Sequence, residues 1–195
     1  MSHFSINVNV GMDDGTGANP ALQGICLLAL DVDGVLTDGS INMGAQGELF
    51  KSFYAQDGLG ISVALRSGLE IAIITGRKSE IIHRRAQELG IQMVQEGVKD
   101  KYLALEQLQN QLGLSRGQVA YMGDDLNDLP AFRAAGVTFA PADAVHDVRE
   151  AASFVTEAAG GRGAVREAIE MILQAQHKWE QIVNSYLDAG QGDKQ

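Results

Sequence analysis

Cysteine and long apolar runs are both scarce in this sequence. Cys26 is the only cysteine among 195 residues, which excludes a disulfide framework and a cysteine-based zinc cluster. No apolar stretch is long enough to span a bilayer, and the N-terminus lacks the basic start and apolar core of a secretory signal. We therefore expect a cytoplasmic protein without a membrane partner.

Basic residues are also few. Lysine and arginine total 15 against 25 aspartates and glutamates, and the formal net charge is −10. A chain this acidic repels nucleic acids and anionic membrane surfaces, so neither is an expected partner. An anionic substrate would need local cations or a metal ion to reverse the field at its site.

Apolar runs and amphipathic segments alternate along the chain. Hydrophobic residues make up 45% and charged residues 21%, which is typical of one globular domain with a sizeable core. The runs "ICLLALD", "EIAIIT" and "QVAYMGD" predict buried strands, and segments such as "KSEIIHRRAQELG" predict helices between them. This order predicts an α/β fold, a mostly parallel sheet with helices on both faces.

The domain limits follow from composition. We expect a glycine-rich, disordered N-terminal arm at 1–20, one domain at 21–187 and a flexible C-terminal tail at 188–195. Two alternating runs separated by glycines predict a β-hairpin at about 41–53.

Glycines also suggest helix limits. "GISVALRSG" predicts a helix that begins near Gly60 and is closed by Gly68, and a single long helix is expected from about Gly163 to Leu187.

Polar residues follow three of the predicted strands at their carboxyl ends. In parallel sheets, ligands bind outside this edge, so these residues are expected to form one site. They are Asp31 and Asp33 after the first strand, Thr75, Gly76 and Arg77 after the second, and Asp124 and Asp125 after a later one.

The chemistry of these residues favours phosphoryl transfer. Asp31, Asp33 and Asp124 offer only oxygen ligands, which favour Mg²⁺ over zinc. A carboxylate beside such a metal can form an aspartyl-phosphate, and a second one can protonate the leaving alcohol and then activate water. Thr75 and Lys101 suit the phosphoryl oxygens, since Asp100 as N-cap directs Lys101 toward the strand edge.

Simpler interpretations exist for several residues. "DVDG" matches part of a calcium loop, but the third acid and the closing glutamate do not follow at the required spacing. A lone Asp-x-Asp is most often a solvated turn, Asp128 could merely cap its short helix, and Lys101 could be a surface lysine. "GGRGAVRE" at 160–167 is either a flexible turn or a mobile tail whose Arg162 reaches an anion in a neighbouring site.

Four segments resemble, in order, the motifs of the haloacid dehalogenase (HAD) superfamily of phosphotransferases. They are "DVDGVLTDG", "ITGR", a helix-starting "DK" and "GDDLND", and the resemblance covers about residues 25–170. It implies a Rossmann-like HAD fold with Asp31 as nucleophile and Asp33 as general acid/base. Thr75 would bind the phosphoryl group and Lys101 would neutralise it.

The same resemblance implies a Mg²⁺ site. Asp31, Asp124 and the main-chain carbonyl of Asp33 would hold the ion, and Asp125 and Asp128 would take supporting positions.

Three longer segments are similar to one family within that superfamily, the 3-deoxy-D-manno-octulosonate 8-phosphate (Kdo-8-phosphate) phosphatases of lipopolysaccharide synthesis. The segments are "GELFKSFYAQDGLGI", "ITGRKSEIIHRRAQELGI" and "GGRGAVRE". Members are capless homotetramers in which the hairpin of each subunit helps to cover the next site. The gaps Asp38–Thr75 and Arg77–Lys101 leave no room for a cap domain, and apolar hairpin residues favour association. The resemblance therefore implies a capless, tetrameric Kdo-8-phosphate phosphatase.

The family's substrate contacts transfer to particular positions. Arginines suit an acidic sugar because their planar fork pairs with a carboxylate. Ser62 stands where some members have an arginine, which leaves the details of sugar binding open. The implied contacts are Asp33, Tyr54, Ala55, Gln56, Asp57, Gly58, Ser62, Arg77, Arg85 and Lys101.

Two other functions remain open from the sequence. One is a phosphatase of the same fold that acts on another sugar phosphate, such as a nonulosonate 9-phosphate. The other is a non-catalytic binding protein of the same fold.

Overall fold

Six parallel strands form the centre of the molecule in the computed structural model, which describes residues 19–189. Their order is β5-β4-β1-β6-β7-β8. The strands are β1 Leu27–Leu30, β4 Glu70–Ile74, β5 Met93–Gln95, β6 Val119–Met122, β7 Val137–Ala140 and β8 Phe154–Val155. Every pairing between them is parallel, so the predicted α/β fold is confirmed.

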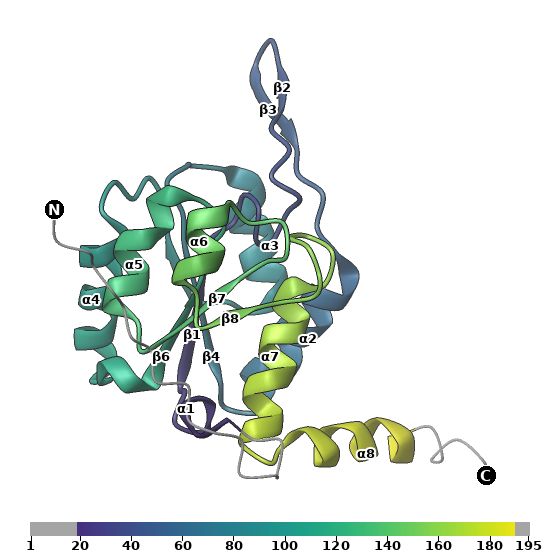
Figure 1. Cartoon of the computed structure of the whole chain (residues 1–195). Coiled ribbons are helices and arrows are strands. Elements are labelled where there is room, and N and C mark those ends of the chain that lie inside the picture. The colour runs from purple at the N-terminus through teal and green to yellow at the C-terminus, as the bar shows by residue number, and fades with distance from the viewer. Residues whose placement is uncertain (1–18, 190–195) are drawn as a thin grey trace, which may run out of the picture.

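Helices cover both faces of this sheet (Figure 1). Side chains of α1, α2, α3 and α7 belong to the core on one face, and those of α4, α5 and α6 to the core on the other. The bounds are α1 Pro20–Gln23, α2 Ala55–Arg66, α3 Glu80–Leu89, α4 Lys101–Leu112, α5 Leu129–Ala134, α6 His146–Ala151, α7 Ala164–Ala175 and α8 Trp179–Ala189.

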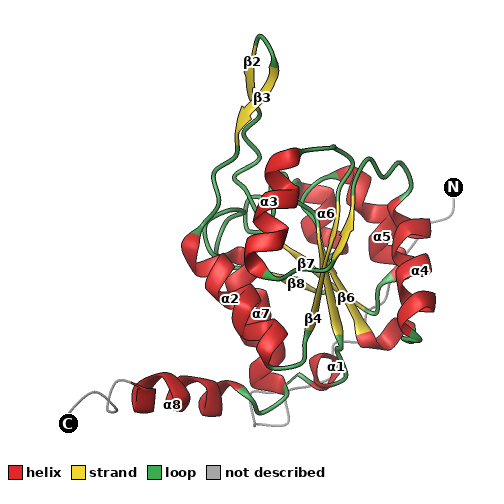
Figure 2. Cartoon of the chain, turned by 180° about the vertical axis from the view of Figure 1, so that it is seen from behind, coloured by secondary structure: helices red, strands yellow, loops and turns green. Residues whose placement is uncertain are grey.

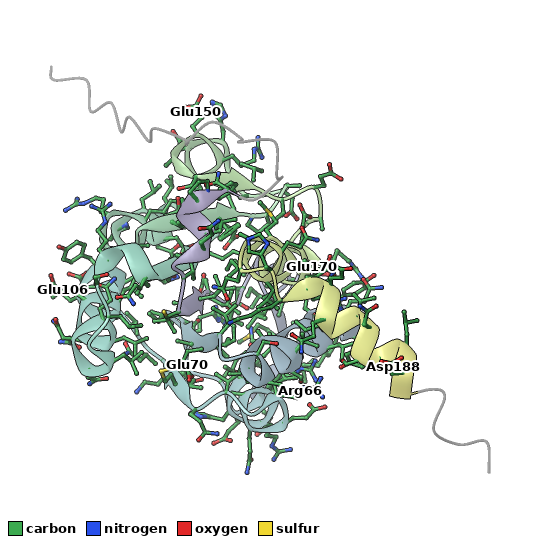
Figure 3. All side chains as sticks on the ribbon, turned by 90° about the horizontal axis from the view of Figure 1, so that it is seen from below. Arg66, Glu70, Glu106, Glu150, Glu170 and Asp188 are labelled. Atoms are coloured by element: carbon green, nitrogen blue, oxygen red, sulfur yellow. The ribbon has the colours of Figure 1, made fainter. Side chains whose placement is uncertain are left out.

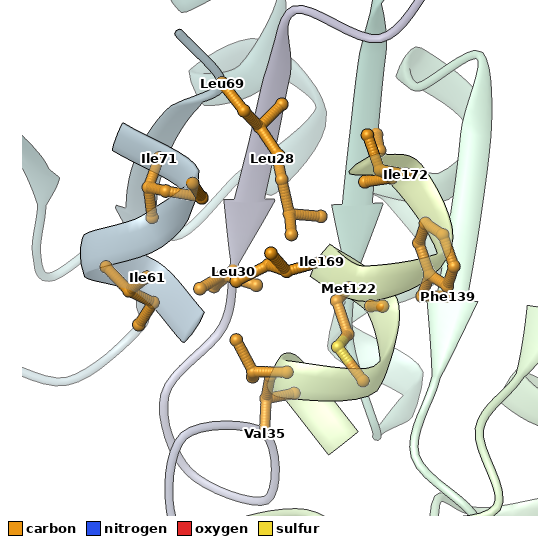
Figure 4. Packing of buried hydrophobic residues seen from close by; sticks show 14 of the residues in the cluster. Leu28, Leu30, Val35, Ile61, Leu69, Ile71, Met122, Phe139, Ile169 and Ile172 are labelled. Atoms are coloured by element: carbon orange, nitrogen blue, oxygen red, sulfur yellow. The ribbon is translucent and has the colours of Figure 1, made fainter. Parts of the chain in front are cut away.

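The central strand β1 shows how the sequence builds two cores. Successive side chains of a strand point to opposite faces, so Leu28 and Leu30 pack into one core while Leu27 and Ala29 pack into the other. Figure 4 shows Leu28 and Leu30 among side chains from α2 and α7. A strand buried on both faces needs a continuous apolar run, which is what "LLAL" supplies.

A hairpin of β2 Asn42–Gly44 and β3 Gly47–Phe50 rises from the edge of the sheet where β1 ends (Figures 1 and 2). It lies between β1 and α2 and within the predicted range of 41–53. Its exposed apolar side chains are Ile41, Met43, Leu49 and Phe50.

Two helix predictions were wrong. Helix α2 begins at Ala55 and not near Gly60, although it contains Gly58. A β-carbon at Gly58 would lie 2.4 Å from Arg85 Nη2, so the glycine leaves room for the Arg85 guanidinium and does not end the helix. The long final helix is two helices, α7 and α8, which separate at His177, whose φ is +55°.

The predicted terminal segments lie mostly outside the described residues. Residues 1–18 and 190–195 are not described, whereas Pro20 already begins α1 and Asp188 still belongs to α8. Figure 3 shows α8 leaving the body of the domain with Asp188 near its far end. None of the helices in residues 19–189 has the length and apolar character needed to cross a membrane.

Candidate active site

Asp31 follows β1 directly and is only 5% exposed. Its backbone amide donates to the Met122 carbonyl at 3.0 Å, so the parallel pairing of β1 with β6 continues to the first residue of the site. Lys101, the first residue of α4, places its ammonium 2.9 Å from Asp31 Oδ2. The N-cap Asp100, which accepts from the Leu103 amide, fixes this helix start as expected.

Asp128 contacts both Lys101 and the loop that follows β6. It is fully buried, and its Oδ1 lies 2.6 Å from the Lys101 ammonium. Its Oδ2 accepts from the backbone amides of Asp124 at 3.0 Å and Asp125 at 3.2 Å. Asp128 thus holds both Lys101 and the loop after β6. The sequence had left open that Asp128 only caps a short helix, and the structure gives it these further contacts.

Tyr121 on β6 is a site residue that the sequence analysis missed. Its hydroxyl donates to Asp128 Oδ1 at 2.8 Å, and the residue has no exposed surface. Burial and the neighbouring charge of Asp128 raise the pKa of Tyr121 well above its usual value, so the phenol stays neutral and remains a donor. The apolar run "VAYM" gave no sign of this contact.

The carboxylates of Asp31, Asp124 and Asp128 share the single positive charge of Lys101. Burial, together with the charge of Asp128, raises the pKa of Asp31 to about 6, with Lys101 opposing the shift. Burial and the charges of Asp128 and Asp31 raise the pKa of Asp124 to about 7. Burial alone would lower the pKa of Lys101, but Asp31 and Asp128 raise it. One ammonium therefore serves several carboxylates, and a further cation would be stabilised here.

The donor atoms fit a hard divalent cation. Carboxylate oxygens of Asp31, Asp124 and Asp128 lie within 4.8 Å of one another, and Asp124 Oδ1 is, among residues 19–189, a buried oxygen without a hydrogen-bond partner. Asp128 is already occupied by four donors, so Asp31 and Asp124 are the side chains free to bind an ion. Oxygen-only ligands favour Mg²⁺, and the main-chain carbonyl of Asp33 stays a predicted ligand.

The Asp33 carboxylate contacts two cations other than Lys101. Its Oδ1 lies 2.5 Å from the ammonium of Lys51, and its Oδ2 lies 3.7 Å from Arg77 Nε. Lys51 was missed in the sequence because nothing local marks it as buried. Burial lowers the pKa of Lys51, but hydrogen bonds to Asp33 and Glu48 raise it by more, so the side chain stays charged.

A pocket of about 240 Å³ opens at this edge of the sheet. Thr75, buried after β4, lies in its wall, and the backbone amide of Arg77 donates to the Thr75 hydroxyl at 3.4 Å. The lining residues are Asp31, Asp33, Gly39, Ile41, Thr75, Gly76, Arg77, Asp124, Asp125 and Asn127. Residues from three strand ends therefore meet, as the sequence analysis expected.

Several of the implied substrate contacts lie outside this pocket. Tyr54, Ala55 and Gln56 lie at the start of α2, and Ser62 lies further along the same helix. Arg85 on α3 stacks over the Phe53 ring with its guanidinium carbon 5.4 Å from the ring centroid. These substrate roles remain predictions.

Asp57 has a structural task that the sequence did not indicate. Its two carboxylate oxygens accept from the Gly163 amide at 3.3 Å and the Arg166 amide at 2.8 Å. It therefore binds the first turn of α7, and a substrate would have to compete with these donors.

The glycine segment at 160–163 packs inside its own chain. A β-carbon at Gly160 would lie 1.8 Å from the Gly34 carbonyl oxygen, and the Gly161 amide donates to the Val35 carbonyl at 2.9 Å. Arg162 Nη2 lies 3.7 Å from Asp38 Oδ2. The segment therefore supports the loop that follows Asp31. That Arg162 reaches an anion in a neighbouring site stays a prediction.

The sequence of this chain is similar to those of known phosphatases. The haloacid dehalogenase-like hydrolase family matches residues 91–169. A 3-deoxy-D-manno-octulosonate 8-phosphate phosphatase of Haemophilus influenzae is 44% identical over 171 residues, which cover 88% of this chain and 92% of the relative. The Escherichia coli (strain K12) phosphatase of that name is 46% identical and covers 82% of this chain and 85% of its own length.

Solved structures show the same likeness. The Moraxella catarrhalis 3-deoxy-D-manno-octulosonate 8-phosphate phosphatase, in complex with a magnesium ion, a phosphate ion and a KDO molecule, has a TM-score of 0.83 and 42% identity. It covers 85% of this chain and 95% of its own. The predicted family is thus confirmed: this chain belongs to the 3-deoxy-D-manno-octulosonate 8-phosphate phosphatases, within the haloacid dehalogenase-like hydrolases.

Proposed function

We propose that the protein is a Mg²⁺-dependent phosphatase that hydrolyses Kdo-8-phosphate to Kdo and inorganic phosphate. The observation that carries this is the arrangement of Asp31, Lys101 and Asp124 at one edge of the sheet, with an unpartnered buried oxygen on Asp124. The substrate follows from family membership at 44% identity over 88% of the chain. Hydrolysis of this phosphomonoester would serve lipopolysaccharide biosynthesis.

The first half of the reaction uses two aspartates. The Asp31 carboxylate attacks phosphorus and forms an aspartyl-phosphate, while Asp33, as general acid, gives a proton to the oxygen of the leaving sugar alcohol. Lys101 and the Thr75 hydroxyl stabilise negative charge on the phosphoryl oxygens. Because Asp128 holds Lys101, the positive charge of the ammonium is already in position before the substrate binds.

The second half returns the enzyme to its starting state. The Asp33 carboxylate takes a proton from water, the water oxygen attacks phosphorus, and the bond to Asp31 breaks to release inorganic phosphate. When bound by Asp31, Asp124 and the Asp33 carbonyl, Mg²⁺ would neutralise the carboxylates and polarise the phosphoryl oxygens. Asp125 would support the loop that carries Asp124.

We assign Arg77 to the recognition of the sugar. It lines the pocket and is about half exposed, with 48% of its side-chain surface accessible. A guanidinium can pair with the carboxylate of an acidic sugar through two hydrogen bonds. Arg85 and the segment from Tyr54 to Gly58 would complete sugar recognition beside it.

The test is phosphate release with Mg²⁺ from four substrates: Kdo-8-phosphate, a nonulosonate 9-phosphate, glucose 6-phosphate and p-nitrophenyl phosphate. We expect kcat/KM to favour Kdo-8-phosphate by about 100-fold, or ~2.7 kcal/mol. A preference for the nonulosonate ester would identify the alternative substrate. Asp31→Asn should abolish turnover, and unchanged hydrolysis in that variant would refute the mechanism.

We also propose that the enzyme is a homotetramer. The apolar hairpin residues support association, since Met43 is 57% exposed and Leu49 is 63% exposed. The expected cytoplasmic location rests on the sequence alone. Light scattering of the purified chain tests the tetramer, and cell fractionation tests the location.

A further inference from the structure

Lys51 lies at the base of the hairpin, directly after β3, yet only 1% of its side chain is exposed. Its ammonium lies 2.5 Å from Asp33 Oδ1 and 2.9 Å from Glu48 Oε1. A buried ammonium is costly unless opposite charges contact it directly. The place of this side chain is therefore set by the two carboxylates.

Glu48, which belongs to β3, is itself anchored. Its second carboxylate oxygen accepts a hydrogen bond from the Ser79 hydroxyl. Ser79 precedes α3, and its backbone amide donates to Glu96 Oε1 at 2.9 Å. A continuous chain of contacts thus runs from the loop after β4, through the hairpin, to the side chain of Asp33.

The two oxygens of Asp33 have different surroundings. Oδ1 is held by Lys51, whereas Oδ2 lies 3.7 Å from Arg77 Nε and receives no hydrogen bond from residues 19–189. Asp33 lines the pocket, with 19% of its side chain exposed. Oδ1 is thus fixed by a short contact, whereas Oδ2 has only the longer ion pair with Arg77.

We propose that Lys51 is a positioning residue, whose ammonium holds Asp33 Oδ1 so that Oδ2 carries the proton in both halves of the reaction. This inference rests on the proposed phosphatase function. In the first half the proton leaves Oδ2 for the bridging oxygen as the bond from that oxygen to phosphorus breaks and the Asp31–phosphorus bond forms. In the second, Oδ2 takes a proton from the attacking water as the Asp31–phosphorus bond breaks.

The test compares two leaving groups in the variant Lys51→Met, which keeps the length of the side chain and removes its charge. The sugar alcohol of Kdo-8-phosphate needs a proton to leave, but p-nitrophenolate does not. The ratio kcat/KM contains only the steps up to departure of the alcohol, so later hydrolysis does not affect it. We expect kcat/KM to fall by about 100-fold for Kdo-8-phosphate and by less than about threefold for p-nitrophenyl phosphate. The fall should lie in kcat and not in KM.

Two further variants separate positioning from folding. Lys178 Nζ donates to the Ser67 carbonyl at 3.0 Å, at the end of the domain away from the hairpin, so Lys178→Met should leave both substrates unaffected. Glu48→Gln keeps its shape and weakens the anchor of Lys51. It should lower the ratio of kcat/KM for Kdo-8-phosphate to kcat/KM for p-nitrophenyl phosphate by at least about fivefold. If Lys51→Met does not fold, this variant tests the positioning role of Lys51 in its place.

Equal losses on the two substrates would overturn the inference, because a general structural defect does not distinguish leaving groups. An unchanged Kdo-8-phosphate rate in a folded Lys51→Met protein would overturn it as well. A wild-type chain without activity on Kdo-8-phosphate would instead refute the proposed function.

Discussion

Tyr121→Phe tests the buried network beneath the site. The change removes one hydroxyl, which donates to Asp128 Oδ1 at 2.8 Å in a position without solvent exposure. Asp128 keeps three donors: Lys101 and the amides of Asp124 and Asp125. The lost contact is therefore one hydrogen bond to a charged acceptor, and no buried carboxylate is left unpartnered.

Such a bond contributes about 2 kcal/mol to the free energy of unfolding. For a domain of this size, that corresponds to a fall in Tm of ~4–8 °C. Because Asp128 stays in place, kcat should fall by less than about tenfold. Urea unfolding at a fixed protein concentration, followed by circular dichroism, measures the first effect, and phosphate release measures the second.

Tyr186→Phe is the matched control. The Tyr186 hydroxyl accepts from Arg66 Nη2 at 2.6 Å, but the residue is 49% exposed. Water replaces such a contact, so the loss should be about 0.5 kcal/mol or less. Equal stability changes for the two variants would refute the argument that the Tyr121 hydroxyl gains its importance from burial beside Asp128.

Three further outcomes are expected. Gly160→Ala places a β-carbon 1.8 Å from the Gly34 carbonyl oxygen, so it should lower the free energy of unfolding by about 1–3 kcal/mol and remove most of the activity. The control Gly117→Ala has open space around its β-carbon and should change neither stability nor activity. Equal melting curves for the two variants would contradict this packing. Leu49→Asp should reduce the mass measured by light scattering, whereas Leu187→Asp, at the same 63% exposure on α8, should not; a tetramer in both variants would exclude the hairpin from the interface. EDTA should abolish turnover and added Mg²⁺ should restore it, so full activity after chelation would refute the metal assignment.

Most of the sheet could be predicted from the sequence because its strands are short, apolar and separated by amphipathic segments. The errors fall on helix ends. The helix predicted to begin near Gly60 already includes Gly58, whose missing side chain leaves room for the Arg85 guanidinium. The separation of α7 from α8 depends on the left-handed backbone of His177, which no local residue preference demands.

Some residues of the candidate site could be predicted from the sequence, and others could not. Asp31, Thr75 and Asp124 follow strands, so the topology of a parallel sheet is enough to bring them together. Lys51 and Tyr121 reach the site through side-chain contacts with Asp33 and Asp128, which lie 18 and 7 residues away in the sequence. Their contacts depend on how the hairpin folds back and on which face of β6 is covered, and neither can be derived from local sequence.

The packing of 160–163 on the loop after Asp31 also bears on how the protein is made. The nucleophile and its loop are synthesised first, and the segment that supports them is made about 130 residues later. Contacts so distant in sequence form late, and domains emerge N-terminus first during translation. A nascent or truncated chain that ends before Gly160 would therefore carry every proposed catalytic residue without the contact that holds its nucleophile loop. We expect catalytic activity only after this segment has been made.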